Sequence, residues 1–207
     1  MTKAEIRTQF LAILNRSDCT NALADTFIER GITKSQRTLR VPALERTDEI
    51  TIGAVFDGLD IPNDFIAPIA VYRTSSSDSY KLERVSLAEY LDHPSVAGNP
   101  NVWTRKGSKL LLKPTPSEND VIILLYYGEF EAFTGDSDEI PMSIIVPELF
   151  YYGGLLYAAD YFLDDRKSLW EQTYNSILLE LQAQADDEEL SGGAVTQPAY
   201  NFPSEGF

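Results

Sequence analysis

Apolar and aromatic residues fill the segment Pro147–Leu163 (PELFYYGGLLYAADYFL) without gathering on one face of a helix. A helix that is apolar on all sides is buried on all sides, in a core, a membrane or an assembly. Gly153, Gly154, Ala158 and Ala159 lie in its middle, where small residues let neighbouring backbones approach closely. Each glycine costs about 1 kcal/mol of helix propensity relative to alanine, so close packing is the expected compensation. We therefore predict a central helix on which the other helices pack.

The same segment is nearly long enough to span a membrane, which takes roughly 20 apolar residues. Pro147, Glu148 and Asp160 interrupt it, however, and no basic residue lies between Lys113 and Arg166. A membrane helix usually has Lys or Arg near one end. A buried helix is therefore the favoured interpretation, and no membrane partner is expected.

Three further helices are predicted by apolar residues at spacings of three and four. They cover about 3–15, 21–39 and 166–185. Thr2 and Glu5 form a capping-box pattern at the start of the first helix. These helices and the central one are expected to form a single bundle.

A basic stripe lies on the second of these helices. Arg30, Lys34 and Arg37 follow one another at i, i+4 and i+7, which places them on one face. Such a stripe is usually a solvated helix face. The functional alternative is that it meets the acidic half of a neighbouring copy.

Between the second helix and the central one, short apolar runs alternate with turn residues. Ile66–Arg73 and Tyr80–Val85 resemble a hairpin, and 101–113 resembles a second hairpin. Ser86–Leu91 reads as a short capped helix. The run Asp120–Gly128 (DVIILLYYG) is continuously apolar, so we expect a strand that is buried on both faces.

These patterns predict an α+β fold in four parts. The segments 1–43 and 129–185 form a helical bundle, and 44–128 is an inserted antiparallel β module. The remainder, 186–207, contains Gly, Pro, Ser and an acidic run without periodicity, so it cannot bury enough apolar area to fold alone. It nevertheless contains four apolar residues that are unusual in a solvated tail: Val195, Tyr200, Phe202 and Phe207. We expect an extended arm that orders against a partner, with plain disorder as the alternative.

The net charge of −15 is carried almost entirely by the second half of the chain. Residues 1–113 are nearly neutral, whereas 114–207 hold 2 basic residues against 18 acidic ones. Such a surface repels nucleic acid. It suits a basic protein partner, or a passage through which DNA slides without specific binding. A surface that only keeps the protein in solution is the alternative.

No catalytic or metal-binding pattern is found. His93 is the only histidine and Cys19 the only cysteine, so a disulfide and the usual zinc sites are excluded. No nucleophile motif or phosphate-binding glycine loop appears. We therefore expect no enzymatic activity and no cofactor. The polar N-terminal residues do not resemble a signal peptide, so we expect a protein that is made and used in the cytoplasm, or built into a particle that assembles there.

The order of several segments resembles the head–tail adaptor (connector) proteins of tailed bacteriophages, of the short-tailed-phage type. The resemblance covers about residues 20–180. The matching segments are RTLRVPALE (37–45), DIPNDFIAPIAVYR (60–73), GNPNVWTRKGSKLLLKPTPSENDVIILLYYG (98–128) and IPMSIIVPELFYYGGLLYAADYFLDD (140–165), followed by Trp170 and Tyr174.

The resemblance implies a structural virion protein at the head–tail interface. It implies a dodecameric ring beneath the portal that extends the DNA channel towards the tail. In related adaptors the C-terminal arm lies along the portal, and the β module would then meet the tail nozzle or tail fibres. The alternatives are a tail-completion or terminator ring, or an acidic oligomeric binding module of the cytoplasm.

A ring would also explain why the central helix is apolar on all sides, because a neighbouring copy would cover part of it. The residues expected at that interface are Gly153, Gly154, Tyr157, Ala158 and Tyr161. On this hypothesis, Gly154→Leu or Ala158→Leu weakens assembly more than it weakens folding of the monomer.

Overall fold

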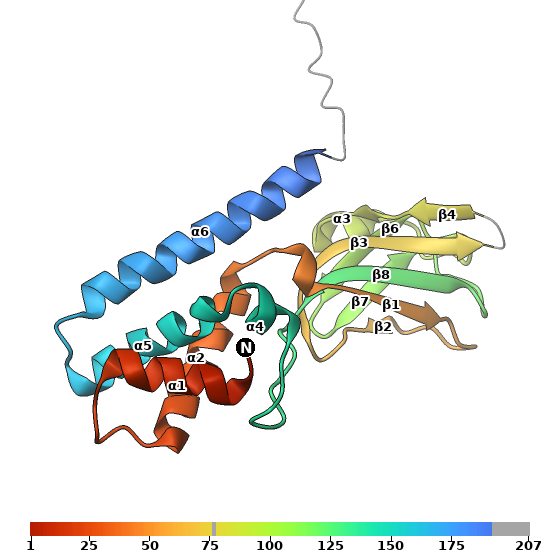
Figure 1. Ribbon diagram of the computed structural model, residues 1–207. Coiled ribbons are helices and arrows are strands. Elements are labelled where there is room, and N and C mark those ends of the chain that lie inside the picture. Colours follow the sequence, from red (N-terminus) through yellow and green to blue (C-terminus); the bar gives the residue numbers. More distant parts are fainter. Residues whose placement is uncertain (76–77, 192–207) are drawn as a thin grey trace, which may run out of the picture.

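The computed structural model describes residues 1–75 and 78–191, which form a helical bundle with a β module at its side (Figure 1). The bundle helices are α1 (Lys3–Leu14), α2 (Asn21–Thr38), α4 (Pro141–Ile145), α5 (Pro147–Phe162) and α6 (Lys167–Ser191). The segments before and after the β module thus build one core, and the predicted α+β fold is confirmed.

The helix ends follow from local chemistry. The Thr2 hydroxyl accepts from the Glu5 N–H, and the Glu5 carboxylate accepts from the Thr2 N–H, so the predicted capping box is present. Thr20 caps α2 in the same way through the Leu23 N–H. Pro42 follows the end of α2 and begins a short 3₁₀ helix, η1 (Pro42–Leu44).

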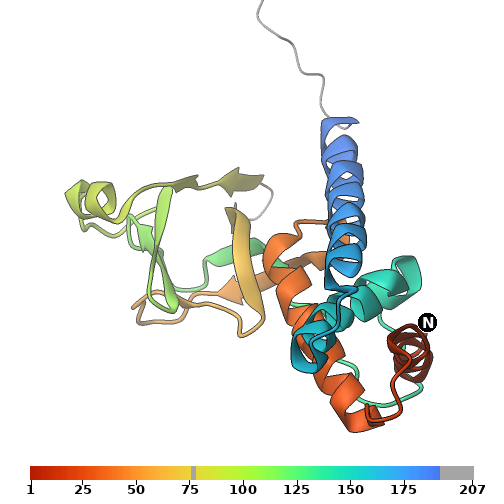
Figure 2. The same cartoon turned by 90° about the vertical axis from the view of Figure 1, so that its left-hand side faces the viewer.

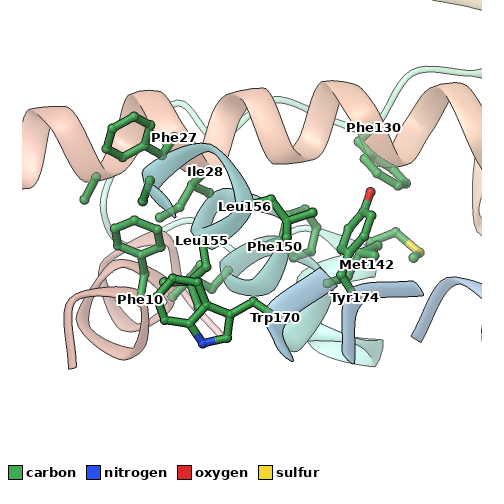
Figure 3. Close-up of a cluster of buried hydrophobic side chains, with 14 of the residues drawn as sticks. Phe10, Phe27, Ile28, Phe130, Met142, Phe150, Leu155, Leu156, Trp170 and Tyr174 are labelled. Carbon is green, nitrogen blue, oxygen red and sulfur yellow. The ribbon is translucent and has the colours of Figure 1, made fainter. Parts of the chain in front are cut away.

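The central position of α5 is confirmed. It packs against α1, α2 and α6, and Leu149, Phe150, Leu155 and Ala158 are fully buried in the common core (Figure 3). Burial does not extend all round the helix, because Asp160 and Tyr161 near its end are exposed. The chain's own helices therefore cover most of the apolar surface that the sequence pattern left unexplained.

The β module consists of two four-stranded sheets that share one core. The first sheet has the order β1 (Glu45–Thr51), β8 (Val121–Gly128), β3 (Phe65–Ser75), β4 (Asp78–Lys81). The second has the order β2 (Leu59–Asp60), β7 (Lys109–Lys113), β6 (Val102–Lys106), β5 (Glu83–Arg84). A short helix, α3 (Leu87–Asp92), lies at the end of the module far from the bundle (Figure 2).

Three expectations about the β module need correction. The strand β8 is buried on alternate residues only, because it is the centre of a sheet whose outer face is partly exposed. The module is not wholly antiparallel, since β5 pairs with β6 in parallel. The expected return strand 80–85 divides at buried Leu82, so that β4 and β5 belong to different sheets.

The expected arm begins later than the sequence indicated. Residues 186–191 continue α6 as helix, because the acidic run DDEELS contains good helix formers. Val195, Tyr200, Phe202 and Phe207 lie outside the described residues. Both views show α6 extending beyond the other helices of the bundle (Figures 1 and 2).

The turn between α5 and α6 is held by an ion pair that makes stability depend on pH. The carboxylate of Asp164, 11% exposed, accepts hydrogen bonds from the Arg166 side chain and backbone. Arg166 in turn donates to the carbonyls of Ile13 and Leu14 at the end of α1. The hydrogen bonds from Arg166 lower the pKa of Asp164 to about 2.

A lowered carboxyl pKa stabilises the fold above the unfolded-state pKa of about 3.9, and this contribution is lost as the pH falls towards 2. We therefore expect Asp164→Asn to lower the free energy of unfolding at pH 6. The difference from the parent should shrink between about pH 4 and pH 2. Urea unfolding across this range measures it, with Asp165→Asn as the exposed neighbouring control. A difference that does not vary with pH would exclude the ion pair as its source.

Candidate interaction surfaces

The small residues of α5 serve a contact within the chain. A Cβ atom added to Gly31 of α2 would lie 2.5 Å from the Gly153 carbonyl carbon and 2.5 Å from the Gly154 nitrogen. A Cβ on Gly154 would lie 3.1 Å from the Ile28 backbone. The backbones of α2 and α5 therefore touch where the helices cross, near Ile28 in Figure 3.

This contact corrects part of the expected oligomer interface. Gly153, Gly154 and Ala158 are buried by the chain's own helices, so the close approach they permit is to α2 and not to a neighbouring copy. Tyr157 is half-buried. Tyr161 is 64% exposed, although its ring packs 5.6 Å from that of Phe27. Of the five predicted residues, Tyr161 offers the most surface to a partner.

Tyr161 belongs to an exposed apolar surface at the junction of α5 and α6. We call Tyr161, Leu163 and Leu169 the corner. Leu163 is 88% exposed and Leu169 is 60% exposed. Leu163 ends α5 in a left-handed conformation, with φ at 53°. Sequence reasoning missed the two leucines because each looks like an ordinary apolar helix residue.

Two apolar grooves flank the second half of α6. The first, which we call the α2–α6 groove, is lined by Thr38, Leu39, Asn175, Leu178, Leu179 and Gln182. The second lies on the side of α4 and is lined by Val41, Pro42, Ala43, Met142, Ile145, Leu181, Gln184 and Ala185. Leu179 beside the first groove is 72% exposed. Both grooves join segments far apart in the sequence, so periodicity within one segment could not reveal them.

The basic stripe lies beside the first groove. Arg30 and Arg37 are exposed, while Lys34 is half-buried with its Nζ 5.0 Å from the centre of the Tyr174 ring. None of the three forms an ion pair with another side chain in 1–74 or 79–187, the ranges whose side chains the structure describes. The stripe therefore keeps charge available to a partner, and its pairing with a neighbouring copy stays a prediction.

The described residues form no recognisable catalytic centre. Burial raises the pKa of the Cys19 thiol, which disfavours the reactive thiolate. The His93 carbonyl accepts a hydrogen bond from Lys113, as in an ordinary structural loop. Within the described part of the chain, no three His, Cys, Asp or Glu side chains gather to hold a metal ion. No helix in the same part is both long and apolar enough for a membrane span.

A family model described as SU10 adaptor protein matches residues 1–198, which include the bundle, the β module and the beginning of the C-terminal segment. Among curated proteins, no sequence matches the chain.

Proposed function

Because the chain belongs to the SU10 adaptor protein family, a family of phage head–tail adaptors, we propose that it forms a ring between the portal and the tail. The observation that carries this proposal is the family match over residues 1–198. The ring, a dodecamer on the portal, extends the channel through which DNA leaves the head. The protein acts at the head–tail interface of the virion and is assembled in the host cytoplasm.

The arrangement of the chain supports a role between two partners. The β module protrudes from one side of the bundle, and α6 extends beyond the other helices (Figures 1 and 2). These two projections can contact different proteins at once. We assign the β module to the tail nozzle or tail fibres.

We assign the C-terminal segment to the portal. The helix that precedes this segment, α6, ends at Ser191 beyond the other helices of the bundle (Figure 1). Val195, Tyr200, Phe202 and Phe207 then supply apolar anchors in a segment that lacks a core of its own. The acidic residues just before them favour a basic surface on the portal.

The charge of the chain suits a channel wall. Residues 114–207 carry 18 acidic and 2 basic residues, and repeated copies would multiply this charge around an axis. Carboxylates around a channel repel the DNA phosphates, so DNA slides through without specific binding. The same charge gives no support to a role in holding DNA.

Native mass spectrometry of the protein mixed with the portal ring of its phage tests the proposal. We expect a complex with one adaptor per portal subunit. A free protein that is monomeric agrees with the proposal, because the portal provides the template for assembly. The absence of a portal complex at any salt concentration would contradict it.

Truncation after Ser191 tests the assigned role of the arm. We expect the truncated protein to lose portal binding while its melting temperature stays unchanged, because the core lies within residues 1–191. A full-length variant with Ser at 195, 200, 202 and 207 keeps the length and charge and serves as the matched control for apolar anchoring. Full portal affinity of the truncated protein would show that the arm is not the anchor.

A further inference from the structure

The corner contains an unusual combination of backbone conformation and exposure. Helices that end in the left-handed conformation usually place Gly or Asn there, because a larger side chain is strained. Leu163 occupies this position at φ 53° and leaves 88% of its surface in solvent. Tyr161 and Leu169 expose further apolar surface from the same junction. Contacts within the chain do not explain why a leucine occupies position 163, whereas burial of its side chain against a partner would explain it.

The α2–α6 groove is complementary to the corner in hydrophobicity and charge. Leu39, Leu178 and Leu179 give it an apolar lining, and the exposed Arg37 directly precedes Thr38 of the same lining on α2. The corner in turn carries Asp165, which is exposed and forms no ion pair with any described residue. The corner therefore offers an exposed leucine next to an acidic residue, and the α2–α6 groove offers an apolar lining next to a basic residue. The two surfaces are complementary in hydrophobicity and in charge.

One copy cannot join its own corner to its own groove. Leu163 precedes α6, and Leu178 lies 15 residues further along the chain. From Lys167, where α6 begins, to Leu178 the helix rises about 16 Å at about 1.5 Å per residue, so the corner lies far from the groove of the same copy. The occupant of the groove must therefore come from another molecule or from the segment beyond Ser191.

We propose that the corner of one copy inserts Leu163 into the α2–α6 groove of the next copy, with Asp165 facing Arg37. This inference rests on the proposed ring and names the contact that joins its subunits. Charge complementarity selects a second copy as the occupant. Residues 1–43 hold seven basic and four acidic residues, whereas residues 129–185 hold two basic and eleven acidic ones. A contact between two different surfaces is heterologous, and it closes into a ring when its rotation permits.

Leu163→Asn separates assembly from folding. Asn is well tolerated in the left-handed conformation, so the melting temperature should stay the same or rise. The number of copies bound per portal ring at limiting concentration should fall at least tenfold. Leu91→Asn, on α3 and 70% exposed in the parent, is the matched control and should change neither quantity. Unchanged assembly of Leu163→Asn on the portal would overturn the proposal.

Cross-linking identifies the occupant directly. In a Cys19→Ser background, the full chain with Leu163→Cys and Leu179→Cys is treated with a short bismaleimide on portal rings. We expect a ladder of covalent multimers, and dimers at most from either single cysteine. Portal rings that carry their full complement of the protein but yield no ladder would overturn this contact and leave the proposed function standing.

An exchange of charge tests the orientation. Arg37→Glu should weaken assembly on the portal about tenfold, and adding Asp165→Arg should restore it. Arg30→Glu, on the same stripe but further from the groove, is the control for a general loss of positive charge. Failure of the double variant to recover would overturn the pairing of Asp165 with Arg37.

Discussion

Gly31→Leu is expected to prevent the helical bundle from closing, and Gly31→Ala to lower the free energy of unfolding by about 2–3 kcal/mol. The Cβ of alanine would lie 2.5 Å from backbone atoms of both Gly153 and Gly154. Backbone atoms within α5 cannot swing aside as the end of a flexible side chain can. The two helices must therefore move apart, which loosens the core around Ile28 and Phe150.

The sign of the effect distinguishes packing from helix propensity. On propensity alone, Gly31→Ala in the middle of α2 would stabilise the protein by about 1 kcal/mol. Chemical denaturation of parent and variant measures the outcome. Gly53→Ala is the control, because a Cβ there meets no atom within 4 Å. A Gly31→Ala protein that is as stable as the parent would show that α2 and α5 can move apart without lowering the free energy of unfolding.

The backbone contact between α2 and α5 also changes the effect expected from substituting the other small residues of α5. The sequence favoured an effect of Gly154→Leu and Ala158→Leu on assembly rather than folding. Because both positions are buried within the monomer, we now expect these substitutions to destabilise the fold first and assembly only as a consequence. The small residues did signal a close backbone approach. The partner, Gly31, lies more than a hundred residues away, and nothing local identified it.

Local features were predictable where the residues that decide them are near neighbours. The capping box of Thr2 and Glu5, the cap at Ser86 and the hairpin of β6 and β7 all have this property. The burial of β8 was not predictable in the same way. Val121, Ile123 and Leu125 look like core residues, but their side of the sheet has no second layer to cover it fully.

The same distinction holds for the interaction surfaces: a residue within one segment could be predicted, and a surface built from distant segments could not. Tyr161 was found because it lies in the central apolar segment. The α2–α6 groove was missed, since Leu39 and Leu178 are brought together only by the packing of the bundle. Ser35 and Tyr174 are a similar case, for their hydroxyl oxygens meet at 3.0 Å in the core although the residues belong to opposite ends of the chain.

Arg7→Met is expected to lower the free energy of unfolding by about 2 kcal/mol, because Arg7 joins three segments of the bundle. Its guanidinium, on α1, bonds to Asp25 of α2 and to Asp136 in the loop before α4. The Nη2–Oδ2 distance to Asp25 is 2.8 Å, and the Nη1–Oδ2 distance to Asp136 is 3.1 Å. The Arg7 side chain is 11% exposed, so the expected loss lies between about 1 kcal/mol for surface pairs and 3–5 kcal/mol for buried ones.

The pH dependence of this loss identifies its origin. Hydrogen bonds from Arg7 hold the pKa of Asp136 below its ordinary value. The contribution of the pair is therefore complete above the unfolded-state value of about 3.9 and is lost as the pH falls through the lowered pKa. Urea unfolding should show the difference between parent and Arg7→Met shrinking in acid.

The matched control is Arg16→Met, whose parent side chain pairs with neighbouring Asp18 on the surface at 2.8 Å and reaches a distant segment through the Phe162 ring, 4.4 Å from its guanidinium, rather than through an ion pair. Methionine keeps the length and apolar stem of arginine in both variants, so the comparison isolates the charge and its hydrogen bonds. An equal loss for the two variants would mean that the connection of α1, α2 and the loop contributes nothing beyond a surface pair. A larger loss for Arg7→Met that does not change as the pH falls would instead assign it to packing of the arginine stem.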